Sequence, residues 1–152
     1  HLSDRRQRQM CIRDSYYRVS MFRLSTRFLK RGVYHYDFPI HPMACPRPRF
    51  TKYGRPYMPK KYMDWKKDLV SMMQDKKHQF NHPIKIKLEF IFFSENKPWG
   101  PHHQKPDVDN LCKAFMDACQ DADMLIDDSI VFSLSASKFW GPAPKIRCIV
   151  QH

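Results

Sequence analysis

The chain has 152 residues, of which 42% are hydrophobic, and its formal net charge is +12. This length allows one domain with a real core, and the apolar content excludes a disordered basic tail. Because no apolar run reaches the length of a membrane span and none precedes a small-residue cleavage site, we expect neither a membrane protein nor a secreted one. The strongly basic charge favours a polyanionic partner such as nucleic acid.

The cysteines give little reason to expect covalent or metal cross-links. Five are present, an odd number, and they form no C-x-x-C pair. A disulfide framework or a structural zinc site is therefore not expected, and the composition suits a reducing cytoplasm.

Residues 1–20 differ from the rest of the chain. They lack apolar periodicity, and five arginines against two aspartates give them a charge of +3, which leaves +9 for the remainder. The segment RQMCIRDS (residues 8–15) resembles translated sequencing-adapter sequence. We therefore interpret residues 1–20 as a non-native or disordered extension, with a native start at Met21 or nearby and a single domain over residues 21–152. The alternative is a genuine basic arm that touches DNA.

The first predicted elements are a strand, a long loop and a helix. Residues 33–40 (VYHYDFPI) combine β-branched and aromatic side chains, which predicts a strand. Residues 41–59 are rich in proline, basic and aromatic residues and predict a long ordered loop, a kind that is often functional. Pro59 is then expected in the first turn of a helix, because apolar residues follow at helical spacing: Tyr62, Trp65, Leu69, Met72 and Met73.

The second half of the chain predicts three strands and one helix. Residues 84–93 and 129–139 have strand alternation, and residues 108–121 have a helical pattern between them. Residues 145–150 alternate again after the break at Gly141 and Pro142. The order β-loop-α-β-α-β-β predicts an α+β fold, with a small mixed or mainly antiparallel sheet and two helices packed on one face.

The stretch KPDVDNLCK (residues 105–113) concentrates carboxylates in an otherwise basic chain. Asp107 and Asp109 stand at the start of the predicted helix, where both can converge on one cation, and Asn110 lies beside them. Mg²⁺ prefers carboxylate oxygens, and it suits phosphodiester hydrolysis because it activates water and stabilises developing charge. The alternative for one of the two aspartates is helix capping.

Other polar residues are candidates for the same site. Asp127 and Asp128 lie at the entry to the strand of residues 129–139; either a strand end beside the helix start supplies a third carboxylate, or the pair belongs to a turn. Lys113, one helical turn after Asp109, either touches a scissile phosphate or pairs with Asp109 at the surface. Glu89, on the polar face of its strand, is a weaker candidate. His102 and His103 precede the motif in a polar loop and are expected to be solvated.

These residues resemble the RusA family of Holliday junction resolvases. The resemblance rests on D-V-D-N-L-x-K (residues 107–113), on a helix containing F-M-D-A (residues 115–118) and on L-I-D-D-S-x-V (residues 125–131). Upstream, P-R-P-R-F-T-x-x-G-R-x-Y-x-P (residues 46–59) is similar to the basic loop of phage-type members, and I-K-I-K-L-E (residues 84–89) is also similar.

The resemblance implies a small homodimeric endonuclease that needs Mg²⁺, with Mn²⁺ as a substitute. It implies resolution of four-way DNA junctions, in recombination and repair, in the cytoplasm of a bacterium or a phage-infected cell. By position, Asp107, Asp109 and Asp128 match the catalytic metal-binding aspartates, and Lys113 matches the catalytic lysine. Asp127, Asn110 and Glu89 are supporting candidates. Pro106 stands where the family often has a basic residue, with Lys105 one step earlier.

The expected partner is branched DNA, read by shape and backbone charge more than by base contacts. Phe50 either stacks on an unpaired base at the branch point or packs beneath its own loop. Two other functions remain open: a Mg²⁺-dependent nuclease for flaps or forks, and a non-catalytic dimer that binds branched DNA. The residues expected to contact the DNA backbone are Arg47, Arg49, Lys52, Arg55 and Lys105.

Overall fold

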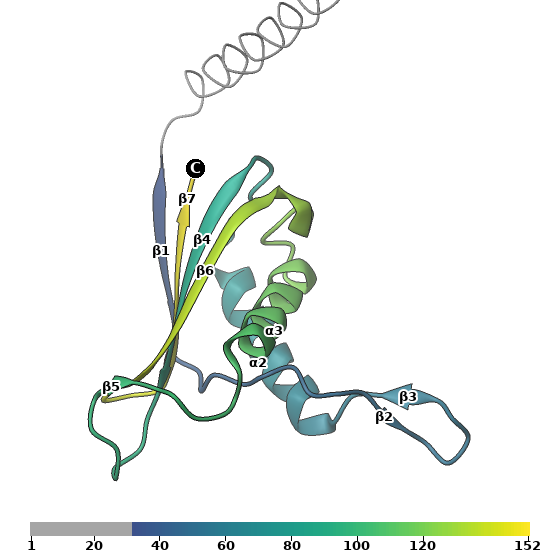
Figure 1. Ribbon diagram of the computed structural model, residues 1–152. Helices are drawn as coiled ribbons and strands as arrows, with labels where there is room; N and C mark the ends of the chain where they lie inside the picture. The colour runs from purple at the N-terminus through teal and green to yellow at the C-terminus, as the bar shows by residue number, and fades with distance from the viewer. Residues whose placement is uncertain (1–31) are drawn as a thin grey trace, which may run out of the picture. The chain divides into compact units, whose positions relative to one another are not determined.

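The computed structural model describes residues 32–152, so the interpretation of residues 1–20 lies outside the described residues. Its main element is a five-stranded sheet in the order β1-β7-β4-β6-β5 (Figure 1). All neighbouring pairs are antiparallel except β4 and β6, which run parallel, so the predicted mixed, mainly antiparallel sheet is confirmed. The strands are β1 (Val33–Phe38), β4 (Ile84–Phe92), β5 (Gly100–Pro101), β6 (Val131–Trp140) and β7 (Lys145–Gln151).

Two helices, α2 (Lys60–Asp75) and α3 (Val108–Asp121), cover one face of the sheet (Figure 1), as the sequence predicted. Every second residue of β4 is buried, from Ile84 to Phe92, because the strand alternation turns these side chains toward the helices. The helices contribute the apolar stripes that meet them: Tyr62, Trp65, Leu69 and Met73 from α2, and Leu111, Ala114, Phe115, Ala118 and Cys119 from α3. Neither helix has the length and apolar character of a membrane-spanning segment.

The parallel pairing of β4 with β6 determines the direction of α3. Parallel neighbours need a connection that crosses back over the sheet, and α3 is that crossover. The helix therefore starts at the end of the sheet where β4 finishes and ends where β6 begins, as Figure 1 shows. An isolated bridge between Phe80, which precedes β4, and Leu125, which follows α3, marks that second end.

Two segments differ in detail from the prediction. The segment of residues 129–139 does not start as a strand, because Asp128–Ile130 form a single 3₁₀ turn before β6. The loop of residues 41–59 contains a small antiparallel hairpin of its own, β2 (Arg49–Phe50) and β3 (Pro56–Tyr57). Its turn uses Gly54 at φ +75°, a backbone conformation that favours glycine.

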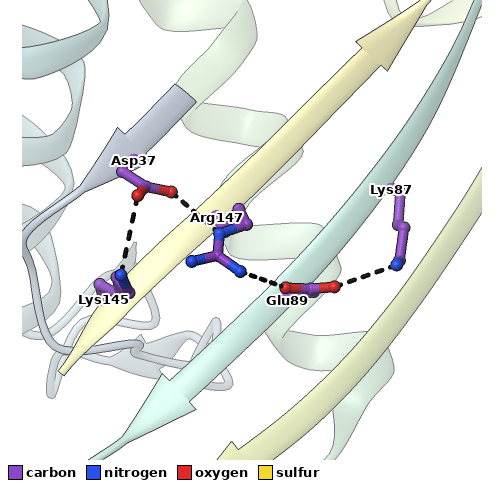
Figure 2. A network of polar contacts seen from close by, with 5 residues as sticks. All are labelled: Asp37, Lys87, Glu89, Lys145 and Arg147. Atoms are coloured by element: carbon purple, nitrogen blue, oxygen red, sulfur yellow. Dashed lines mark hydrogen bonds and ion pairs between the residues drawn. The ribbon is translucent and has the colours of Figure 1, made fainter. Parts of the chain in front are cut away.

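The sheet face opposite the helices carries a network of charged side chains (Figure 2). Arg147 of β7 donates to Asp37 of β1 at 3.2 Å and to Glu89 of β4 at 3.1 Å. Lys87 lies 3.0 Å from Glu89, and Lys145 lies 3.7 Å from Asp37. The lysine hydrogen bond, aided by the charges of Lys87 and Arg147, holds the pKa of Glu89 below its ordinary value of 4.5. The network thus ties three adjacent strands together across their exposed face.

This network predicts a pH-dependent contribution to stability. A carboxylate with a lowered pKa stabilises the fold above its ordinary pKa, and the stabilisation is lost as pH falls through the folded-state pKa. Glu89→Gln should lower the free energy of unfolding by about 1 kcal/mol near neutral pH. The difference should shrink below the ordinary glutamate pKa and vanish once the pH is below the lowered folded-state pKa of Glu89. Urea unfolding across the pH range measures this. Glu95→Gln, an exposed loop control, should show no such trend, and an equal deficit for Glu89→Gln at all pH values would contradict the prediction.

Candidate functional site

Asp107 and Asp109 present two carboxylates at the start of α3. Asp107 is the N-cap residue, in extended conformation at φ −72° and ψ 144°, but its side chain makes no capping hydrogen bond. Asp109 lies in the first turn, and both residues are exposed. Because the Asp107 carboxylate makes no capping bond and the Asp109 side chain is exposed, both groups are available to a cation. The positive end of the helix dipole also favours negative charge at this position.

Lys138 fixes the loop that leads into these aspartates. Its Nζ donates to the backbone oxygen of Gln104 at 2.6 Å and to that of Pro106 at 2.7 Å. Lys138 pairs with Phe90 across β4 and β6, so it projects from the helix-covered face of the sheet toward the start of α3. The ammonium group therefore holds the backbone next to Asp107 against the end of β6.

A basic and aromatic arm begins beside the same helix start. The N–H of Cys45 donates to the backbone oxygen of Asn110 at 3.1 Å, which anchors the base of the arm to the first turn of α3. Beyond this anchor, the β2–β3 hairpin projects away from the sheet and helices (Figure 1). We define the arm as residues 46–58. It carries Arg47, Arg49, Phe50, Lys52, Tyr53, Arg55 and Tyr57, all exposed.

The arm has internal order but no core of its own. The Thr51 N–H donates to the Arg55 oxygen at 2.9 Å, and the Thr51 side chain accepts from the Arg55 N–H at 3.1 Å. Lys52 Nζ lies 4.9 Å from the centre of the Tyr53 ring. Phe50 is 68% exposed, so the alternative in which it packs beneath its own loop is wrong. The four predicted cations and Phe50 thus form one exposed surface that starts beside Asp107 and Asp109.

Asp127 and Asp128 lie elsewhere. Asp127 caps the 3₁₀ turn by accepting the Ser129 N–H at 2.8 Å, and hydrogen bonding from Ser129 lowers the pKa of Asp127. Asp128 is exposed in the same turn, before the first residue of β6. The turn interpretation of this pair is therefore confirmed, and Asp127 has a structural use that Asp128 lacks.

The predicted convergence of a third carboxylate on the helix start does not occur within one chain. The 14 residues of α3, about 21 Å of helix, run from Asp109 toward the opposite end of the β4–β6 pair, where Asp128 lies. Within residues 32–152, no three His, Cys, Asp or Glu side chains form a group that could hold a metal ion. Asp107 and Asp109 both lie at the start of α3, whereas Asp128 lies in the 3₁₀ turn that follows the end of this helix.

The other candidates divide in the same way. Lys113 is exposed on α3 one turn after Asp109, with no ion pair to any residue in the described part of the chain. Asn110 is half-buried at the arm anchor, and Lys105 is exposed in the loop before Asp107. The prediction that Glu89 supports this site is wrong. Glu89 faces away from the helices and forms ion pairs with Lys87 and Arg147.

Sequence reasoning missed Lys138 and misjudged His102. Lys138 lies on the same face of β6 as Leu134, Ala136 and Trp140. A lysine at a core-facing position of a strand was the signal in the sequence that could have identified it. His102 is only 5% exposed, although His103 is exposed as expected. It lies between Phe92 and Trp140, with ring centres at 4.5 and 4.2 Å, and burial lowers its pKa.

A comparison with known protein families finds a match. The family model of the endodeoxyribonuclease RusA matches residues 39–151, which include the arm, both helices, the 3₁₀ turn and every strand except β1. Among curated proteins, none matches the chain.

The Lys138 contacts predict that this side chain orders the loop before Asp107. Lys138→Met should leave two carbonyls without their donor and increase hydrogen exchange at residues 103–107 by about tenfold, which corresponds to about one hydrogen bond. Mass-spectrometric hydrogen exchange measures this, with Lys85→Met on the opposite sheet face as the control. Unchanged exchange in Lys138→Met would show that the loop is held by other contacts.

Proposed function

Because the chain belongs to the RusA family of endodeoxyribonucleases, we propose that it resolves four-way DNA junctions by paired phosphodiester cuts during recombination and repair. One observation carries this proposal: the exposed carboxylates of Asp107 and Asp109 lie at the start of α3, where the base of an exposed basic and aromatic arm is anchored. Carboxylates that hold a cation and a surface that holds phosphates are the two parts that a metal-dependent nuclease needs.

The metal is proposed to be Mg²⁺, with Mn²⁺ as a substitute. Asp107 and Asp109 fit such an ion because both carboxylates are free of capping bonds and offer only oxygen donors. Bound there, the ion would supply an activated water and stabilise charge on the phosphate oxygens. Lys113, exposed one turn along α3, is proposed to contact the scissile phosphate and to stabilise the negative charge that develops during cleavage.

The third aspartate is proposed to come from a partner subunit. Asp107 and Asp109 lie at one end of the β4–β6 pair and Asp128 at the other, so one chain cannot bring all three to one ion. A two-fold dimer applies one operation to both chains, so a contact of one chain's helix start with the other's 3₁₀ turn is made twice. Each site would then combine Asp107 and Asp109 of one chain with Asp128 of the other.

The surface around Asp128 supports a dimer contact at that end of the sheet. Ile126 is 61% exposed, Phe132 67% and Leu134 43%, and these three large apolar side chains flank the 3₁₀ turn in sequence. Exposed large apolar side chains of this kind are available to be buried against a second chain. A homodimer would also place two cleavage sites in a two-fold arrangement that corresponds to the approximate symmetry of a four-way junction.

Branched DNA is proposed to be recognised by shape and backbone charge. The cations of the arm (Arg47, Arg49, Lys52 and Arg55), together with Lys105, are exposed and suit phosphate contacts. Phe50 and Tyr53, which is 78% exposed, are available to stack on bases that lose their partners at the branch point.

Asp109→Asn should reduce junction cleavage by on the order of 100-fold or more, because several kcal/mol of charge stabilisation depend on the metal ligand. Junction affinity should change little, since the arm is untouched. Gel assays of a labelled four-way junction, with linear, flap and fork substrates beside it, measure both. Asp68→Asn, at an exposed position of α2, is the matched control. Preferential cutting of flaps or forks would overturn the proposed substrate but not the site.

Mixing two inactive variants tests the shared site. A heterodimer of Asp109→Asn and Asp128→Asn chains would contain one fully intact site if Asp128 acts across the dimer, and none if it acts within its own chain. Random pairing should therefore restore nicking to about a quarter of the wild-type rate. A mixture of Asp107→Asn with Asp109→Asn should restore nothing. Inactivity of both mixtures would contradict the shared site.

A further inference from the structure

A second candidate binding site lies in the loop between β4 and α3, the loop that leads into the proposed metal site. A pocket of about 250 Å³ is formed by Lys97, Trp99, His103, Gln104 and Trp140 with the prolines of the same loop. It is smaller than the pockets that enclose drug-sized ligands, and its lining combines aromatic rings with a few polar groups. It fits a single planar ring system better than a larger molecule.

One wall of the pocket is rigid because it belongs to the core. The Trp140 ring stacks on that of His102 at 4.2 Å with an interplanar angle of 28°, and His102 packs in turn on Phe92, which is buried. The His102 N–H donates to the Lys138 oxygen at 3.1 Å, which joins this stack to the end of β6. His102 and Phe92, which do not line the pocket, therefore hold the Trp140 ring in one orientation.

The second tryptophan of the pocket, Trp99, is not buried in the core. Trp99 is 73% exposed, although pairing of Gly100 with Trp140 places its segment directly against β6. A tryptophan buries much apolar surface when it has a partner, so an exposed one beside a formed pocket indicates a site for a ligand. Lys97 lies at the same rim and adds a positive charge.

The pocket is mechanically connected to the carboxylates. Gln104 lines it, and the backbone oxygen of Gln104 is one of the two carbonyls that Lys138 holds. Asp107 follows three residues later. A ligand in the pocket and a phosphate near Asp107 and Asp109 would therefore be positioned by the same short, anchored segment.

We propose that this pocket receives one unpaired nucleobase of the DNA strand being cut, next to the scissile phosphate. The inference rests on the proposed function. Bases at a branch point have lost part of their pairing, so moving one out of the stack costs less than in a duplex. Trp99 and Trp140 offer ring faces for it, His103 and Gln104 offer polar groups to its edge, and Lys97 complements the adjacent phosphate. The base that fits best would set a sequence preference for cleavage.

The test combines removal of the Trp99 side chain with removal of single bases from the DNA junction. Junctions with a fixed crossover carry an abasic site at each position flanking the cut in turn. For the wild-type chain, one position should lower junction affinity and cleavage by roughly tenfold, the size expected for a stacked base. Trp99→Ala should cause a similar loss on the intact junction, and the abasic site at that position should then add nothing. Trp99→Phe should restore most of the loss, because it keeps a ring.

Affinity is measured by fluorescence anisotropy with EDTA, so the outcome does not depend on catalysis. Phe93→Ala removes another exposed aromatic ring, at the end of β4 and outside the pocket, and should leave the abasic effect intact. Independent, multiplicative losses from Trp99→Ala and the abasic site would overturn the pocket proposal, as would the absence of any sensitive position. Coupling in binding without metal-dependent cleavage would support the pocket and overturn the proposed function instead.

Discussion

The parallel pairing of β4 with β6 is the constraint on which the arrangement of polar groups depends. Because parallel neighbours must be joined across the sheet, α3 carries the chain from one end of the pair to the other. Asp107 and Asp109 are therefore placed where β4 finishes, and Asp128 where β6 starts. The same crossover buries one face of α3 against the sheet, so the hydrophobic core and the separation of the carboxylates have a single origin.

The end of the sheet where α3 starts is held by a few long-range polar contacts rather than by regular structure. Lys138 bonds the backbone before Asp107, and Cys45 bonds that of Asn110, so a strand and the residue that precedes the arm both contact the backbone at the start of α3. Trp65 on α2 adds a bond to the His41 oxygen at 2.8 Å, which fixes the segment that leads to the arm. Irregular backbone can thereby hold functional side chains as firmly as a helix or strand would.

Much of this fold was predictable from the sequence, because local periodicity reports burial. The alternation from Ile84 onward and the stripe from Tyr62 to Met73 each identified an element and its buried face. The separation of Asp128 from Asp109 was not predictable, because it depends on strand direction, which periodicity does not carry. The motif identified Asp107 and Asp109, but the contacts of Lys138 and the burial of His102 arise from tertiary packing and required the structure.

The arm of residues 46–58 is joined to the domain by its base, and the side chains of its hairpin are exposed. Substitutions in such a segment change little of the buried surface that stabilises the domain. Arm sequences could therefore diverge in evolution without a loss of folding stability, while α3 and the sheet remained under strong packing constraint. If the arm contacts DNA as proposed, new DNA preferences would be easiest to acquire through it, with the cleavage chemistry left unchanged.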